Sequence, residues 1–321
     1  MDVRAVIADF QKHLQGQVSK DAPLSHFSTW KIGGTADVLV SPACVEDVSF
    51  LQRYAHDKSI PCIVIGDGSN MLFDDDGFRG IVIHIGRALS RFEMTADGVV
   101  HAEAGIWTPH FVRKVACAGF KGSEHAIGVP GTLGGLVVMN GGTNRKGIGE
   151  QITSVTIVKE DGKVKIIEKT ACDFSYRHSS LQDGNAVVVG AAFKYEKGDA
   201  SALRLQMITT LMNRNRKFPR KMPNCGSVFL SSPELHEKVG PPGKVVQEAG
   251  FKGFRQGGAM VSDMHANFIV NTGGATSDDV LTLITKIRAA VFERTGHKME
   301  CEARHLLPNG KMVPAHEICA I

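Results

Sequence analysis

Apolar residues in the first third of the chain recur at helix and strand spacings. Val48, Leu51 and Ala55 lie three or four positions apart, which predicts a helix over Val45–Ser59. This helix leads into the short apolar run Cys62–Ile65, which is typical of a buried strand. The pattern therefore predicts mixed helices and strands from the start of the chain.

Strands and turns dominate the middle of the chain. Two apolar runs, Val155–Glu160 and Val164–Glu168, flank an Asp161-Gly162 turn and predict a hairpin. A helix begins at Thr108-Pro109, a cap residue with a first-turn proline, and ends at Gly119. Further strands are predicted at Ile81–Ile85, Val99–Ala104 and Val187–Tyr195.

The last third is richer in helix. Ser201–Asn213 is an amphipathic helix, followed by a basic, proline-broken run from Arg214 to Lys221. A second long helix begins after the cap Thr276 and ends at Gly296. We therefore predict an α+β fold in three parts, 1–85, 86–198 and 199–321, with the last residues free to return to the first part.

Composition narrows the class of protein. The chain has 321 residues, a net charge of +4 and no apolar run long enough for a membrane helix. We therefore expect no nucleic-acid partner, no membrane span and, without an export signal, a cytoplasmic protein. Seven scattered cysteines, Cys319 among them, include no C-x-x-C pair, so we expect reduced thiols and no structural metal.

The most distinctive segment is a glycine-rich loop, Gly66-Asp67-Gly68-Ser69-Asn70, with a strand predicted on both sides. Successive amide groups in such a loop can hold a phosphate or diphosphate. The two common phosphate loops run from a strand into a helix, and neither of their motifs is present. The segment indicates a nucleotide cofactor, although a plain hairpin turn fits it equally well.

Two more glycine segments accompany this loop. Gly128–Gly135 holds four glycines between apolar residues, which favours either a loop wrapped on a large ligand or a tight backbone crossing. Thr29–Gly34 adds a tryptophan and a lysine beside two glycines. Its tryptophan could equally pack in the core.

Three polar segments are candidates for chemistry. Arg177 follows Tyr176 in a polar turn, where a guanidinium could bind a carboxylate or simply lie at the surface. Ser227 follows a glycine before apolar residues and could donate a proton or merely enter a strand. Glu300, Glu302 and Arg304 would share one face of a strand, in a cleft or at a solvated edge.

In their order along the chain, these segments resemble the UDP-N-acetylenolpyruvoylglucosamine reductase (MurB) family, from about Leu24 to the C-terminus. Each motif is unspecific, but seven in order are specific. The motifs are Thr29–Gly34, Gly66–Asn70, Gly128–Gly131 with Met139-Asn140, Tyr176-Arg177, Gly226-Ser227, Gly257-Gly258 with His265–Asn271, and Glu302–Arg304.

The resemblance implies a flavoprotein fold and an FAD site. The fold would be a two-part FAD-binding region of the vanillyl-alcohol-oxidase type, followed by a C-terminal α+β substrate domain. The interval between Arg177 and Ser227 is short, like the branch that lacks an extra tyrosine loop. The implied FAD-binding residues are Trp30, Lys31, Gly33, Gly66, Asp67, Gly68, Ser69, Asn70, Gly128, Gly131, Thr132, Gly134, Gly135 and Asn140.

The resemblance also implies the reaction. The family uses NADPH and FAD to reduce the enolpyruvyl ether of UDP-N-acetylglucosamine enolpyruvate in peptidoglycan synthesis, a pathway tied to cell shape and division. Ser227 would protonate C2, while Arg177 and Glu302 would hold the enol intermediate. Tyr176, Arg216 and Lys217 would bind substrate. The oligomeric state is left open, with a monomer as one possibility.

Departures from the family pattern keep alternatives open. The family usually has Gly-Ala-Tyr-Gly where this chain has Gly141–Gly147. It usually has Lys-Asn-Pro where this chain has Leu230–Pro233, and a valine where this chain has Ala303. A paralogue acting on another substrate, another flavin oxidase or an inert flavin- or UDP-sugar-binding paralogue is therefore an alternative. A hydrolase built on Ser227 or Cys225 is disfavoured, since no motif supplies a base.

Overall fold

The computed structural model describes residues 1–182 and 184–318, and the chain forms two compact units. Unit 1 comprises Met1–Asp21, Asp37–Asp67 and Gly80–Arg214. Unit 2 comprises Ala22–Ala36, Gly68–Arg79 and the chain from Asn215 onward. The three-part division at 85 and 199 stays a prediction, and Cys319 lies outside the described residues.

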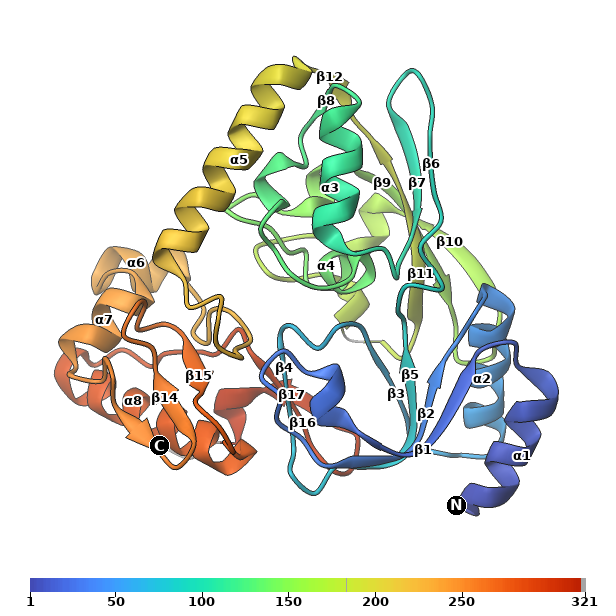
Figure 1. Ribbon diagram of the computed structural model, residues 1–321, viewed down its shortest axis with the longest axis horizontal. Coiled ribbons are helices and arrows are strands. Elements are labelled where there is room, and N and C mark those ends of the chain that lie inside the picture. The colour runs from blue at the N-terminus through green and yellow to red at the C-terminus, as the bar shows by residue number, and fades with distance from the viewer. Residues whose placement is uncertain (183, 319–321) are drawn as a thin grey trace. The chain divides into compact units, whose positions relative to one another are not determined.

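Two sheets form the framework of unit 1 (Figure 1). The first has the order β1-β2-β5-β3 and the second the order β10-β9-β11-β7-β6, while β12 pairs with β8. The strands are β1 Gln17–Pro23, β2 Thr35–Ser41, β3 Cys62–Ile65, β5 Phe78–His84, β6 Phe92–Met94, β7 Val99–Glu103, β8 Phe120–Lys121, β9 Ile152–Val158, β10 Val164–Glu168, β11 Val187–Lys194 and β12 Glu196–Lys197. In the first sheet β3 and β5 run parallel, while the pairs of the second sheet are antiparallel.

Helices pack on these sheets and enclose one apolar core. They are α1 Val3–His13, α2 Val45–Asp57, α3 Thr108–Cys117, α4 Leu133–Val138 and α5 Ala200–Lys217, with short 3₁₀ turns η2 Glu124–Ala126, η3 Ile148–Glu150, η4 Lys169–Cys172 and η5 Ser180–Gln182. Phe10, Phe111 and Phe193 are fully buried in this core. Burial of such large side chains stabilises the unit and holds the connecting loops in place.

Unit 2 has its own core between a long helix and two small sheets. In Figure 1, α8 runs beside β14 and β15, which belong to the sheet β13-β14-β15. The second sheet has the order β17-β16-β4. The elements are α6 Pro233–Lys238, α7 Pro242–Glu248, α8 Ser277–Thr295, β4 Met71–Phe73, β13 Arg255–Gln256, β14 Ala259–Val261, β15 Ile269–Asn271, β16 Arg304–Leu306, β17 Met312–Pro314, η1 Leu24–Phe27 and η6 Ala315–Glu317.

Most predicted elements are confirmed, because their signals are local. The predicted strand Cys62–Ile65 is β3, and the predicted helix at Val45 is α2. Thr276 and Asp279 form a reciprocal capping box at the start of α8, and Gly296 ends that helix with a φ of +68°. The predicted hairpin is formed by β9 and β10, with Val164 opposite Val158.

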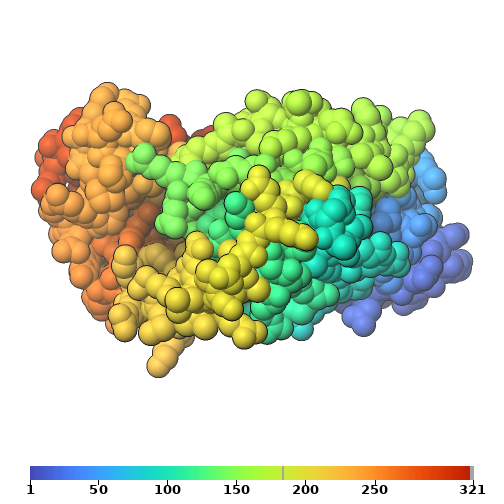
Figure 2. Space-filling view, turned by 90° about the horizontal axis from the view of Figure 1, so that it is seen from above, coloured from blue at the N-terminus to red at the C-terminus, as the bar shows by residue number. Residues whose placement is uncertain are grey.

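Two predictions near the ends of elements were wrong in detail. Helix α5 does not end at Asn213 but continues to Lys217, where Pro219 prevents further extension. Figure 2 shows α5, in yellow, at the surface of unit 1. Around Glu302 the predicted alternation of buried and more exposed side chains holds, since Met299, Cys301 and Ala303 are buried. The regular strand β16, however, begins only at Arg304.

Candidate active site and cofactor loops

The glycine loop Gly66–Asn70 lies between β3 and β4, in the strand–loop–strand setting that the sequence predicts. Gly68 has a φ of +59°, and a Cβ there would collide with the carbonyl oxygen of Phe27. A Cβ on Gly66 would collide with Oγ1 of Thr132. Both positions therefore require glycine. The Gly66 contact also places the first glycine loop against the second.

The second glycine loop is fixed along the segment Ala104–Thr108. The amide of Gly134 donates to the carbonyl of Ala104 at 2.7 Å, and the amide of Thr108 donates to Gly131 at 2.9 Å. A Cβ on Gly134 would lie 2.8 Å from that of Ala104, so the backbones can approach only through glycine. Gly135 differs, because it is exposed and a Cβ there would lie 3.6 Å from Thr132 Oγ1.

Arg214 is a residue that the sequence reasoning missed. Its Cδ and Nε atoms occupy the space that a Cβ on Gly128 would fill. A cation therefore lies directly on the second glycine loop, brought there by α5. The sequence contained only a weak signal, because Arg214 belongs to a basic run from which we singled out Arg216 and Lys217.

Trp30 belongs to the core of unit 2. Its side chain is 0% exposed, and its indole N–H donates to the carbonyl of Ile269 at 2.7 Å. The side chain of Asn271 donates to the carbonyl of Trp30 at 3.0 Å. The amide of Trp30 donates to Oγ of Ser28 at 3.1 Å, so the indole, the amide and the carbonyl of this residue are all bonded within the protein.

Lys31 and Gly33 follow this buried tryptophan along the chain. Lys31 is exposed with a φ of +59°. Gly33 has a φ of +131°, and a Cβ there would lie 2.5 Å from that of Phe73. The backbone of this segment therefore adopts conformations that its neighbours impose.

Asn70 and Glu302 are held together in unit 2. The side-chain amide of Asn70 donates to the carbonyl of Glu302 at 3.0 Å. The amide of Arg304 donates to the carbonyl of Asn70 at 3.0 Å, which continues the parallel pairing of β4 with β16. A predicted cofactor residue thus anchors the main chain of a predicted catalytic residue.

Ser227 lies beside the same Glu302 segment. The amide of Glu302 donates to the carbonyl of Val228 at 2.8 Å. Asn267 fixes the other side, since its Oδ1 accepts from the amide of Phe229 at 2.8 Å and its Nδ2 donates to the Phe229 carbonyl at 2.9 Å. Asn267 is buried, and the sequence around it did not reveal that its side chain supports the Ser227 segment.

Arg177 is presented by a tight turn in unit 1. Ser175 and His178 pair across the turn, and Arg177 has a φ of +57°, a rare conformation for a residue other than glycine. Its Nη2 donates to the carbonyl of Gly142 at 2.7 Å. The guanidinium also lies 5.0 Å from the centre of the Tyr176 ring, which is 37% exposed.

Asn140 has a structural role in supporting this turn. Its Nδ2 donates to the carbonyl of Ser175 at 2.7 Å, and its Oδ1 accepts from the amide of Gly149 at 3.0 Å. The residue is buried with a φ of +41°. Both ends of the side-chain amide therefore bind the protein, and the predicted contact with FAD stays a prediction.

Arg216 and Lys217, the predicted substrate cations, are exposed in the last turn of α5. Asp67 in the first glycine loop is half-buried, which raises its pKa, while His84 and Arg87 act in the opposite direction. Burial lowers the pKa of His84, whose Nδ1 lies 3.1 Å from Oγ of Ser41.

Cys225 is not suited to be a nucleophile. Its thiol is buried, and burial raises its pKa well above the ordinary value, with Glu302 and Cys301 adding to the shift. A buried thiol stays protonated at neutral pH, whereas the thiolate is the reactive form. The structure therefore gives no support to a cysteine-based hydrolase.

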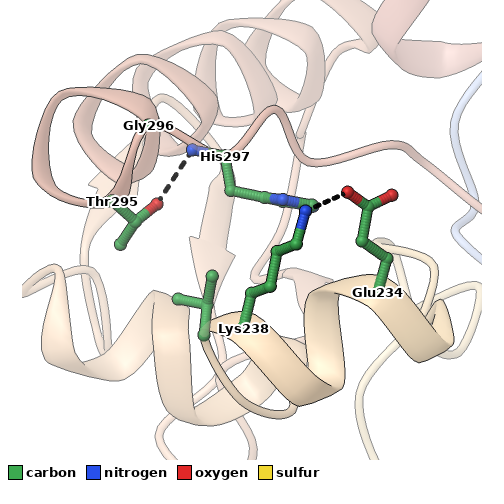
Figure 3. Close-up of a pocket in the computed structure, with 6 residues that line it drawn as sticks. Glu234, Lys238, Thr295, Gly296 and His297 are labelled. Atoms are coloured by element: carbon green, nitrogen blue, oxygen red, sulfur yellow. Dashed lines mark hydrogen bonds and ion pairs between the residues drawn. The ribbon is translucent and has the colours of Figure 1, made fainter.

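A polar pocket of about 570 Å³ opens between α6 and the end of α8 in unit 2 (Figure 3). Glu234 and Lys238 line it and pair with each other at 2.7 Å. The amide of His297 donates to Oγ1 of Thr295. No residue predicted to act in catalysis or cofactor binding lines this pocket, so it is separate from the candidate site.

Within residues 1–182 and 184–318, no cluster of three or more His, Cys, Asp or Glu side chains could hold a metal ion. The expectation of no metal stays a prediction. None of the helices in this described part of the chain is long and apolar enough to cross a membrane. Its six cysteines are free.

Comparison with known proteins decides the family. Residues 36–168 match the model of an FAD binding domain, and residues 218–306 match that of the UDP-N-acetylenolpyruvoylglucosamine reductase C-terminal domain. UDP-N-acetylenolpyruvoylglucosamine reductase 1 of Corynebacterium glutamicum is 43% identical over 298 residues, covering 93% of this chain and 89% of the relative. The chain belongs to the UDP-N-acetylenolpyruvoylglucosamine reductase family.

Further members of the reductase family agree along the whole chain. The UDP-N-acetylenolpyruvoylglucosamine reductase of Heliobacterium modesticaldum is 40% identical, covering 94% of this chain and 95% of the relative. The crystal structure of the Thermus caldophilus reductase (MurB) matches with a TM-score of 0.76 at 27% identity, covering 91% of this chain and 99% of that one. The predicted α+β fold, with an FAD-binding region followed by a C-terminal reductase domain, is confirmed.

Proposed function

We propose that this protein is an FAD-containing, NADPH-dependent oxidoreductase that reduces UDP-N-acetylglucosamine enolpyruvate to UDP-N-acetylmuramate. Membership of the reductase family supports this function. The observation that carries it is the meeting of the two glycine loops, where Gly66 lies against Thr132, a residue close to the exposed Gly135.

The residues of these loops fit an FAD diphosphate. At Gly66, Gly68 and Gly134, protein atoms fill the space of a side chain, so the loops are packed closely on their own framework. At Gly135, by contrast, ordinary space is available and the main chain faces solvent. The amide of Gly135 makes a long bond of 3.4 Å to Oγ1 of Thr132, and the absence of a side chain would let an anionic ligand approach this main chain closely.

FAD, when bound, would carry a hydride from NADPH to C3 of the enolpyruvyl group. The chain itself would manage charge and protons. Arg177, fixed to the carbonyl of Gly142, would hold the substrate carboxylate and the negative charge that develops beside it. Glu302 would stabilise the enol, and Ser227 would donate its hydroxyl proton to C2. The hydrogen bond between Glu302 and Val228 keeps these last two segments adjacent.

The remaining predicted contacts concern the nucleotide part of the substrate. Tyr176 would offer its exposed ring, while Arg216 and Lys217 would bind the UDP diphosphate. The FAD contacts predicted at Trp30, Lys31, Gly33, Asp67, Ser69, Asn70 and Asn140 belong to the same proposal, in which the fully buried Trp30 would support the segment Thr29–Gly34 from within the core.

The proposal extends to where the protein acts in the cell, to its partners and to its parts. Such a reductase would act in the cytoplasm on a peptidoglycan precursor, and so would contribute to cell shape and division. We propose no metal, nucleic-acid or membrane partner, and a monomer as the working state. The first two parts, 1–85 and 86–198, would serve FAD, and the third, 199–321, the substrate.

The proposal is tested by purifying the protein and recording its flavin absorption spectrum. NADPH consumption is then followed with and without UDP-N-acetylglucosamine enolpyruvate. We expect a yellow protein whose NADPH oxidation depends on this substrate. A protein that binds no added FAD would overturn the flavoenzyme proposal, and flavin without substrate-dependent turnover would favour an inert or diverged paralogue.

The role of Ser227 is tested by Ser227→Ala. We expect reduction of the flavin by NADPH to be unchanged, because no proton on C2 is involved, while turnover falls by about 10²–10⁴-fold, the usual contribution of a positioned acid. Ser201→Ala, at an exposed serine at the start of α5, is the control. Equal losses in both half-reactions would refute the proton-donor role.

A further inference from the structure

The loop that departs from the usual family pattern, Gly141–Gly147, is a defined structure. The amide of Ile148 donates to the carbonyl of Gly141 at 2.9 Å and closes the loop. At its tip the amide of Lys146 donates to the carbonyl of Thr143 at 3.1 Å. Asn144 and Arg145 between them have φ values of +56° and +62°, which is the geometry of a type I′ turn.

His125 holds this loop through two hydrogen bonds to one residue. Oγ1 of Thr143 donates to the carbonyl of His125 at 2.5 Å, and the amide of Thr143 donates to Nδ1 of His125 at 3.3 Å. His125 is 6% exposed and Thr143 is half-buried, so both bonds are partly shielded from water. Nδ1 can accept this hydrogen bond only in the neutral ring, and burial lowers the pKa of His125.

Gly142 connects this clamp, formed by His125 and Thr143, to Arg177. A Cβ on Gly142 would collide with the carbonyl of Lys146 and would lie 2.8 Å from Cε1 of His125. The glycine is therefore pressed between the imidazole ring and the loop, and its carbonyl direction is fixed. That carbonyl accepts the 2.7 Å bond from Nη2 of Arg177.

We propose that His125 and Thr143 are positioning residues that hold the guanidinium of Arg177 in place for the reaction. The inference rests on the proposed function, because it takes Arg177 as the group that holds the substrate's charge. A guanidinium must be placed accurately to stabilise charge, and Arg177 itself sits in a turn with an unfavourable φ. The clamp supplies the restraint that the turn alone lacks.

The test removes one hydroxyl. Thr143→Val keeps the shape of the side chain but removes the bond to the His125 carbonyl, while Thr143→Ser retains it. We expect Thr143→Val to lower kcat/KM for UDP-N-acetylglucosamine enolpyruvate by about tenfold, the loss of one buried hydrogen bond, and Thr143→Ser to recover it. Reduction of the flavin by NADPH should not change in either variant.

Thr285→Val is the matched control, because Oγ1 of Thr285 makes a similar bond to the carbonyl of Leu281 within α8 at 2.9 Å. A double variant with Arg177→Lys tests the route. If Thr143 acts through Arg177, its substitution should cost little once the guanidinium is gone, so the two effects should be non-additive. A merely structural role would give additive losses.

Loop order is measured without substrate as the rate of trypsin cleavage after Arg145 and Lys146, both exposed. It should rise in Thr143→Val and not in Thr143→Ser. Unchanged kcat/KM in Thr143→Val, no recovery in Thr143→Ser or additive losses with Arg177→Lys would overturn the inference. Failure of the proposed function is distinguishable, since the wild type would then lack substrate-dependent turnover, and the inference would fall with it.

Discussion

Substitution of Trp30 by phenylalanine tests whether this residue is a core group or a cofactor contact. The sequence allowed both, and the structure buries the indole completely with its N–H bonded to the carbonyl of Ile269 at 2.7 Å. Ile269 lies on β15, the edge strand of its sheet. Trp30→Phe removes this donor and part of the ring while keeping an aromatic side chain.

The expected loss of stability has two contributions. A buried carbonyl left without its donor costs about 1–3 kcal/mol. The ring atoms removed from a fully packed core add about 1 kcal/mol, a fraction of the cost of truncating tryptophan to alanine. Together they should lower the free energy of unfolding of unit 2 by about 2–4 kcal/mol.

The assay is denaturant unfolding followed by far-UV circular dichroism. Trp107→Phe is the matched control, because Trp107 is 48% exposed and lies in unit 1, so its loss should change stability by less than about 0.5 kcal/mol. In Trp30→Phe the emission of Trp107 still reports on unit 1. This separates a local loss in unit 2 from general unfolding.

FAD binding to Trp30→Phe completes the comparison. Because the indole is not exposed, the Kd for FAD of the folded variant, measured by quenching of flavin fluorescence, should equal that of the wild type. Weaker FAD binding with unchanged stability would refute the reasoning from burial and restore Trp30 as a side-chain contact with the cofactor.

Three further substitutions and one change of pH test other parts of the structure. Gly66→Ala should lower the free energy of unfolding, because the new Cβ collides with Thr132. Gly135→Ala should leave the free energy of unfolding equal or higher, and it should raise the Kd for FAD at least about tenfold by filling the open space at Gly135. Equal effects of the two substitutions on stability would contradict this. Thr276→Ala should lower the free energy of unfolding by about 1 kcal/mol through loss of the capping box, measured by denaturant unfolding. Burial lowers the pKa of six histidines below the ordinary 6.5, so the unfolded chain binds more protons below that pH, and the free energy of unfolding should fall as the pH drops from 6.5. Calorimetry should detect proton uptake on unfolding at pH 6, about half a unit below the ordinary histidine value, and its absence would contradict this assignment. The six are His84, His110, His125, His265, His305 and His316.

Local chemistry made much of the fold predictable. The helix at Val45, the strand at Cys62 and the capping box at Thr276 depend on spacing and capping within a few residues, and each was confirmed. The end of α5 was not predictable in the same way. Its continuation to Lys217 follows from good helix-forming residues up to the barrier of Pro219, while the charge pattern suggested a break.

The order of short motifs also carried the family and the cofactor class, because seven weak signals in sequence are jointly specific. The role of each residue was less determined. Glycine segments are compatible with a ligand loop or a backbone crossing, and within Gly128–Gly135 the structure shows a close backbone approach at one glycine and open space at another. Gly134 is needed by packing on Ala104, whereas Gly135 stays open.

Tertiary structure decided the contacts between residues far apart in the chain. Asn70 bonds to Glu302, Thr132 meets Gly66, and Trp30 bonds to Ile269. Such pairings form between segments that only the folded chain brings together, and no local sequence pattern predicts them. By itself, the sequence determined the helices, the strands and the family of this protein. The fold decided which of its polar residues are held at a surface for chemistry and which are used in holding the others.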